Sequence, residues 1–91
     1  MSTNMGKKNS STIHDKRYQN LIASIVQLRK DANISQKKLA EIIGLSQSDI
    51  SKIESCERRV DVVELIDYLH AIAPNNAEQL VNSLLKDLIK A

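Results

Sequence analysis

The hydrophobic residues of this chain recur three or four positions apart, which is the spacing of helices that bury one face. Most of them are Leu, Ile, Val and Ala, and the sequence has two Tyr, no Phe and no Trp. Such aliphatic side chains, together with one Pro and two Gly, favour close-packed helices over a sheet. The pattern therefore predicts an all-α fold, a compact five-helix bundle.

The same pattern divides the chain into a polar tail and one domain. Residues 1–11 are polar and include Gly6, Lys7 and Lys8, so we expect a flexible N-terminal tail. A basic arm that follows DNA and a tail without a specific role both remain open. Residues 12–91 have the length of one small domain, which would gain stability from a partner or a second copy.

The first helix is expected to start in a capping box that runs from Thr12 to Asp15. Asn33 is expected to close it in the left-handed conformation. The apolar face between these ends consists of Tyr18, Leu21, Ile22, Ile25, Val26 and Leu28.

Two further helices are predicted at the C-terminal end. Asp61 can cap the fourth helix and Pro74 ends it. Its expected buried face is Val62, Val63, Leu65, Ile66, Leu69 and Ile72. The last helix, over residues 76–90, opens at Asn75 or Asn76 and carries an apolar stripe that is wide for a small domain. We expect part of this stripe to cover the core and the surplus to form a homodimer through Leu84, Leu85 and Leu88. A single core that absorbs the whole stripe is the alternative.

Residues 35–54 are predicted to form two short helices joined by a tight turn. Ser35 can cap the first of them, and Gly44 can end it because glycine adopts a left-handed conformation at little cost. Ser46 and Asp49 have the spacing of a capping box for the second. The residues expected to hold the pair together are Leu39, Ala40, Ile43, Leu45, Ile50 and Ile53.

The second of these helices has a polar outer face. If Ile50 and Ile53 point inward, the helical period turns four polar residues outward and puts a fifth on the flank. The outward residues are Ser48, Ser51, Lys52 and Ser55, and Gln47 lies at the N-terminal flank. A helix that enters the major groove of DNA needs such a surface, because base edges there present hydrogen-bond patterns. A solvated helix hairpin is the alternative interpretation.

A resemblance to a known family favours DNA binding over the solvated hairpin. Residues 35–54 resemble the helix-turn-helix of phage repressors, the Cro/CI or XRE family. The residues that carry the resemblance are Ser35-Gln36-x-x-Leu39-Ala40-x-x-Ile43-Gly44-Leu45-Ser46-Gln47-Ser48-x-Ile50-Ser51-x-Ile53-Glu54. With its flanks, the resemblance extends over about residues 18–72. It implies sequence-specific binding of double-stranded DNA and regulation of transcription.

The resemblance also implies site residues. Bases would be read by Gln47, Ser48, Ser51 and Lys52. Phosphates would be bound by Gln36, Lys37, Lys38, Ser46, Ser55, Arg58 and Arg59. Arg29 and Glu54 occupy the positions of a structural salt bridge in the family, and two independent surface charges are the alternative. Cys56 stands where the family usually has glycine, so the turn before Arg58 could differ, and its thiol could be a packed side chain or a redox-sensitive one.

The charge distribution agrees with a basic DNA-binding part. Residues 1–60 hold 11 Lys and Arg against 6 Asp and Glu, whereas residues 61–91 hold 2 against 5. A scattered solubilising charge would explain the same numbers. One Cys forms no internal disulfide, no run is long enough to span a membrane, and no signal-peptide core is present, so we expect a cytoplasmic protein. His14 and His70 lack metal-ligand spacing, and we expect neither cofactor, metal nor enzymatic activity.

These observations predict a dimeric regulator, most simply a repressor, that reads a near-palindromic operator through helix 47–55. An activator remains open, and so does contact with polymerase. The alternative is an antitoxin or adaptor of the same fold whose main partner is another protein, such as a toxin. A third possibility is a structural or coactivator module that does not bind DNA.

Overall fold

The computed structural model describes residues 12–90, which form one short 3-10 helix and five α-helices. In chain order these are η1 (Thr12–His14), α2 (Lys16–Asp31), α3 (Gln36–Ile43), α4 (Gln47–Glu54), α5 (Val62–Ile72) and α6 (Ala77–Lys90). The predicted all-α bundle is confirmed. The N-terminal tail expected over residues 1–11 lies outside the described residues.

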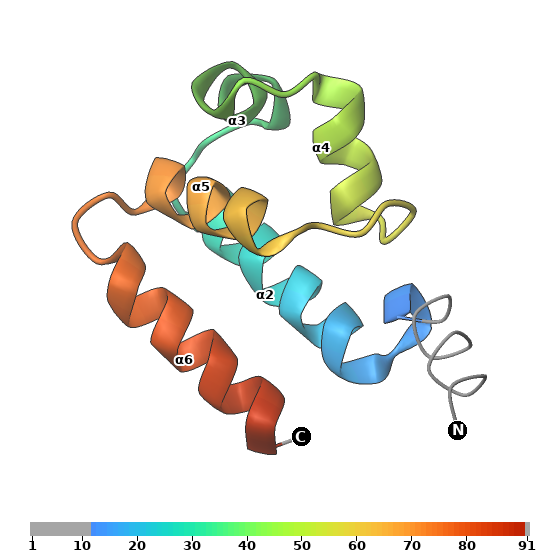
Figure 1. Cartoon of the computed structure of the whole chain (residues 1–91). Coiled ribbons are helices and arrows are strands. Elements are labelled where there is room, and N and C mark those ends of the chain that lie inside the picture. Colours follow the sequence, from blue (N-terminus) through green and yellow to red (C-terminus); the bar gives the residue numbers. More distant parts are fainter. Residues whose placement is uncertain (1–11, 91) are drawn as a thin grey trace.

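Helix α2 is the axis on which the other helices are arranged (Figure 1). It contacts α4, α5 and α6, while the short helices α3 and α4 pack on each other and α3 also packs on α5. The side chains buried most completely come from α2 to α5 and form a single core: Ile22, Ile25, Leu39, Ile50, Ile53, Tyr68 and Leu69. The α3–α4 pair therefore stands at one end of the molecule on a rigid aliphatic base.

The first long helix begins later than predicted. The Asp15 side chain accepts a hydrogen bond from the backbone N–H of Arg17 at 2.8 Å, which makes Asp15 the N-cap. Thr12 to His14 form η1 instead, so the predicted capping box is wrong. At the other end of α2, Asn33 has the predicted left-handed backbone, with φ 59°. The N–H of Ile34 returns to the Arg29 carbonyl at 3.3 Å and closes the helix.

Helix α5 buries only part of the face predicted for it: Leu69 and Ile72 are buried and Leu65 packs against the core. Val62, Val63 and Ile66 are 71%, 66% and 44% exposed, and the buried residues are Tyr68, Leu69 and Ile72. The apolar side of α5 is wider than the part that one small core can cover, so its edge residues stay exposed. Tyr68 enters the core because its ring is apolar and its hydroxyl finds partners there, and this leaves the two valines outside.

Helix α6 divides its apolar stripe between the core and the surface. Leu84 is buried, and Leu80, Val81 and Leu88 pack against the core. Leu85 and Ile89 are 47% and 84% exposed. Leu84 was predicted for the dimer interface, but it is only 8% exposed because α6 packs on α2 and α5, so it has little surface left for a partner.

Candidate nucleic-acid interface

The turn chemistry of α3 and α4 is as predicted. The Ser35 hydroxyl oxygen accepts from the backbone N–H of Lys38 at 3.0 Å, and Gly44 ends α3 with φ 77°. Ser46 and Asp49 form a reciprocal capping box, in which Asp49 N–H donates to Ser46 Oγ at 3.0 Å and Ser46 N–H donates to Asp49 Oδ2 at 3.4 Å. These caps define where both helices start.

The rotation of α4 buries its two isoleucines and exposes its polar side. Ile50 and Ile53 are 0% and 1% exposed, since they contact the core beneath the helix. The outer face of α4 consists of Gln47, Ser48, Ser51, Lys52 and Ser55, all of which are exposed. The face predicted to read bases is thus accessible along its whole length and is not covered by another described segment.

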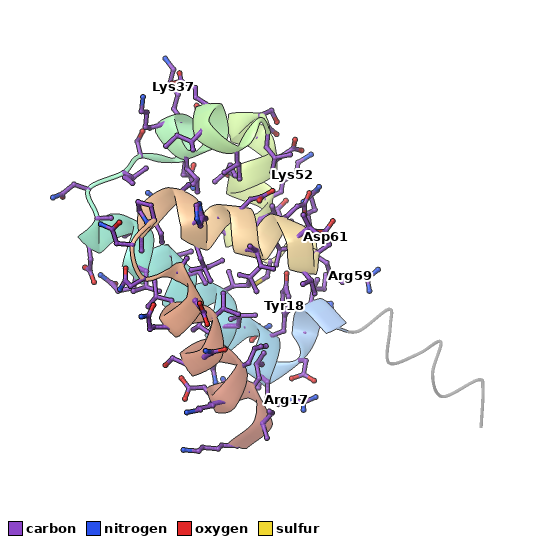
Figure 2. The ribbon with its side chains drawn as sticks, turned by 60° about the vertical axis from the view of Figure 1, so that its left-hand side comes forward. Arg17, Tyr18, Lys37, Lys52, Arg59 and Asp61 are labelled. Atoms are coloured by element: carbon purple, nitrogen blue, oxygen red, sulfur yellow. The ribbon has the colours of Figure 1, made fainter. Side chains whose placement is uncertain are left out.

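Basic side chains surround this face. Lys37 and Lys38 are exposed in the first turn of α3, and Lys52 is exposed on α4. Figure 2 shows Lys37, Lys52 and Arg59 projecting outward from α3, from α4 and from the loop after α4. Their charge suits a polyanionic ligand, because Lys and Arg that neutralise phosphates supply most of the affinity for DNA.

Arg58 is engaged by a carboxylate. Its Nη2 and Nη1 atoms donate to Glu64 Oε2 and Oε1 at 2.8 and 3.1 Å, and the two side chains are 35% and 20% exposed. This hydrogen bond raises the pKa of Arg58 and lowers that of Glu64. Glu64 Oε1 also accepts from Asp61 N–H at 3.2 Å in the capping box of α5. The arginine predicted to bind phosphate therefore also fastens the loop to α5, a role that the sequence analysis missed.

Cys56 adopts the backbone conformation that glycine would supply. Its φ is 62°, a left-handed value that is uncommon for a residue with a side chain. The turn after α4 is therefore kept in spite of the substitution. The side chain packs against the core, and burial raises the pKa of the thiol, which reduces its thiolate character.

Glu54 ends α4 inside a cluster of polar side chains. Arg29 Nε and Nη2 donate to Glu54 Oε2 and Oε1 at 2.7 and 2.8 Å, and the two side chains are only 9% and 6% exposed. The structure thus contains the Arg29–Glu54 pair. Gln36 Nε2 donates to Oε1 at 2.9 Å, and the Tyr68 hydroxyl donates to Oε2 at 2.5 Å. Gln36 braces the C-terminal end of α4 through this bond.

The sequence analysis did not foresee the part played by Tyr68. The available signal was a tyrosine within the apolar pattern of α5, because a buried hydroxyl requires a hydrogen-bond partner. The identity of that partner, 14 residues away on another helix, had no local signal.

Residues 12–90 offer neither a candidate metal centre nor a membrane-spanning helix. Over this range, three or more His, Cys, Asp or Glu side chains do not gather in a way that could hold a metal ion. Among the helices described, none has both the length and the apolar character needed to cross a membrane.

The comparisons with known proteins agree with the geometry. A family model described as helix-turn-helix matches residues 25–72. A solved structure of an XRE-family like protein from Pseudomonas syringae pv. tomato str. DC3000 is similar, with 38% sequence identity and a TM-score of 0.72 over 87% of this chain and 95% of that one. No curated protein matches the sequence significantly. The chain belongs to the helix-turn-helix family of the XRE type, and it is in general terms a DNA-binding regulator.

Proposed function

We propose that this protein is a sequence-specific transcriptional regulator, most simply a homodimeric repressor, that reads a near-palindromic operator through α4. The observation that carries the proposal is the outer face of α4, which is polar, basic and exposed above two fully buried isoleucines. Duplex DNA as the ligand is consistent with the cytoplasmic location expected from the sequence.

In this mechanism α4 lies in the major groove and α3 lies across the backbone. Gln47 can bond an adenine at two positions, Lys52 favours the acceptors of guanine, and the serines are permissive. Phosphates on the near side would be bound by Gln36, Lys37, Lys38 and Ser46, and those on the far side by Ser55, Arg58 and Arg59. Phosphate contacts set the register, and the base contacts of α4 set the sequence preference.

A homodimer would use apolar surface that the core leaves uncovered. Ile66 of α5 and Val81 of α6 line one shallow groove. Val62 and Val63 continue the exposed surface along α5, and Leu85 follows Val81 one turn later on α6. We call these five residues the α5–α6 surface. Leu84 and Leu88 belong to the core or its edge. The proposed interface therefore moves to Leu85 and the exposed apolar residues of α5. A twofold dimer would then place two α4 helices about 34 Å apart, one turn of DNA.

The exposed α5–α6 surface also supports the alternative, an antitoxin or adaptor whose main partner is another protein. Single exposed apolar side chains are common, whereas several that adjoin one groove favour a protein partner. A repressor dimer and a toxin-binding adaptor would both use this surface, and co-purification of a second small protein would favour the adaptor.

Selection of bound fragments from random duplex DNA, followed by sequencing, tests the proposed function. We expect a preferred sequence with twofold symmetry and half-sites about one turn apart. Recovery without any preferred sequence would contradict a sequence-specific regulator.

A point variant then tests α4 as the reading helix. Gln47→Ala should weaken binding to the selected site by about 1–3 kcal/mol, with little effect on random DNA, because only the selected site offers the base contact. The matched control is Gln79→Ala, an exposed glutamine on α6, which should leave both affinities unchanged. Equal weakening of both DNAs by Gln47→Ala would show that this residue does not read a base.

A further inference from the structure

The carboxylate of Glu54 is saturated with hydrogen bonds. Each oxygen accepts two: Oε1 from Arg29 Nη2 and Gln36 Nε2, and Oε2 from Arg29 Nε and the Tyr68 hydroxyl. A carboxylate has about four lone-pair sites, so no further donor is needed. The donors come from α2, α3 and α5, and the acceptor is the last residue of α4. Four helices are therefore tied together at one functional group.

Because Glu54 is the last residue of α4, the position of its carboxylate affects the orientation of that end of the helix. A negative charge at the C-terminal end of a helix is opposed by the helix dipole, so the fixed donors must hold it there. Ile53 precedes it in the core, and the outer-face residues Ser51 and Lys52 lie within the same turn. A shift of the carboxylate would tilt the end of α4 and move these two side chains.

Tyr68 is the donor whose role is easiest to separate from packing. Its ring is 1% exposed in the core, and a phenylalanine ring would fill the same volume. Its hydroxyl has one proton to donate; the Glu54 oxygen is at 2.5 Å, whereas the Ile25 carbonyl oxygen is at 3.4 Å. The proton therefore goes to Glu54, in a short charge-assisted hydrogen bond.

We propose that Tyr68 is a positioning residue for DNA recognition, whose hydroxyl fixes Glu54 and thereby the orientation of the C-terminal half of α4. This inference rests on the proposed function. In the proposed complex Tyr68 does not touch DNA; it acts through Glu54 on the presentation of Ser51 and Lys52.

The protonation of Glu54 reports on this contact. Burial acts to raise the pKa of Glu54, but hydrogen bonds from Arg29, Tyr68 and Gln36 outweigh it and leave the pKa lowered. Arg29 of α2 and Tyr68 of α5 are the ionisable groups that face the carboxylate, and α3 contributes the neutral amide of Gln36. Loss of the hydroxyl should therefore move the titration of Glu54 to higher pH.

Tyr68→Phe tests the proposal, with Tyr18→Phe as the matched control. Tyr18 loses an equivalent hydroxyl, but its partner is the backbone N–H of Val60 at 2.9 Å and not Glu54. In the free protein, NMR titration of the Glu54 carboxyl carbon should move to higher pH in Tyr68→Phe only. Residual dipolar couplings of the α4 amides, referenced to α2, should change in the same variant only.

DNA binding supplies the functional measurement. Tyr68→Phe should weaken binding to the selected operator by about tenfold, the usual consequence of losing a hydrogen bond to a charged group, and should affect random DNA much less. Unchanged titration and unchanged couplings in a folded Tyr68→Phe protein would overturn the proposal. If the wild type prefers no DNA sequence, the proposed function fails, but the titration and the couplings still decide whether Tyr68 positions α4.

A second variant covers the case in which Tyr68→Phe does not fold. The sequence has only two tyrosines, so fluorotyrosine incorporated into the Tyr18→Phe protein labels position 68 alone. Fluorine makes the hydroxyl a stronger donor while the ring stays in place. The Glu54 titration should then move to lower pH than in unlabelled Tyr18→Phe, and an unchanged titration would contradict the proposal.

Discussion

Glu54 shows at the scale of a single residue how a charge can be kept inside a small domain. Arg29 neutralises it, and the same guanidinium donates from Nη1 to the Ile34 carbonyl at 2.7 Å. Within residues 12–90, every buried side-chain nitrogen or oxygen has a hydrogen-bond partner. Because such a network compensates its own desolvation, removal of one member costs more than the intact pair contributes.

Glu54→Gln is accordingly expected to lower the free energy of unfolding by about 3 kcal/mol or more, since Arg29 would stay buried without its counter-charge. Chemical denaturation at neutral pH measures this. Glu41→Gln, an exposed position on α3, is the control and should change stability by less than about 0.5 kcal/mol. A Glu54→Gln protein as stable as the wild type would show that the pair is dispensable.

The pH dependence of stability follows from the same residue. The pKa of Glu54 is lower in the folded chain than its ordinary value of 4.5, so its stabilising contribution is present above that pH. The contribution is lost as the pH falls through the folded pKa. Wild-type stability should therefore decline in acid below about pH 4.5, and Glu54→Gln should decline less steeply over the same interval.

At the scale of elements, the loop between α4 and α5 joins the proposed reading helix to the rest of the fold. Cys56 makes the left-handed turn, and Arg58 then reaches Glu64 in the first turn of α5. Glu64 and a DNA phosphate would compete for one guanidinium. The loop thus combines a stabilising ion pair with a proposed phosphate contact, and the two roles oppose each other.

We expect Glu64→Gln to strengthen binding to operator and random DNA alike by several-fold, because it removes a negative charge beside Arg58, which is proposed to bind phosphate. Titrations at several salt concentrations measure the effect, and Arg58→Ala should lower the salt slope by about one. The gain should vanish in the Arg58→Ala/Glu64→Gln double variant. If that double variant binds more tightly than Arg58→Ala alone, the gain does not come from Arg58.

At the scale of the whole molecule, the proposed DNA-binding surface and the proposed protein-binding surface occupy different parts of the fold. The outer face of α4 and the basic side chains around it belong to α3, α4 and the loop that follows. The α5–α6 surface is formed by helices that pack against α2 beside this pair (Figure 1). A second copy or another protein could therefore bind without covering α4.

Leu85→Asp tests this arrangement. A charge at position 85 of the α5–α6 surface should dissociate a homodimer at concentrations where the wild type stays associated, as sedimentation would measure. Because Leu85 is 47% exposed, helical content should remain unchanged. Ile42→Asp is the control, since Ile42 is 50% exposed on α3, outside this surface, and its substitution should leave association intact. Equal masses for wild type and Leu85→Asp would exclude a dimer through this surface.

Local chemistry made much of this protein predictable from its sequence. Features that depend on neighbours within four residues were all found where predicted. They are the helix caps Ser35 and Ser46, the left-handed residues Gly44 and Asn33, and the inward-facing Ile50 and Ile53. The start of α2 was missed because the alternative cap, Asp15, lies only three residues from the predicted one.

What the sequence by itself determined is the helix-turn-helix and its outward polar face, because both arise from short-range periodicity and capping. Only the tertiary structure decided which side of α5 is buried, that Leu84 belongs to the core, and that Tyr68 and Glu64 hold Glu54 and Arg58. These outcomes depend on which helices meet and on how much apolar surface one small core can cover. Even Arg58 and Glu64, six residues apart, meet only because the loop folds back on α5, and no local pattern records such contacts.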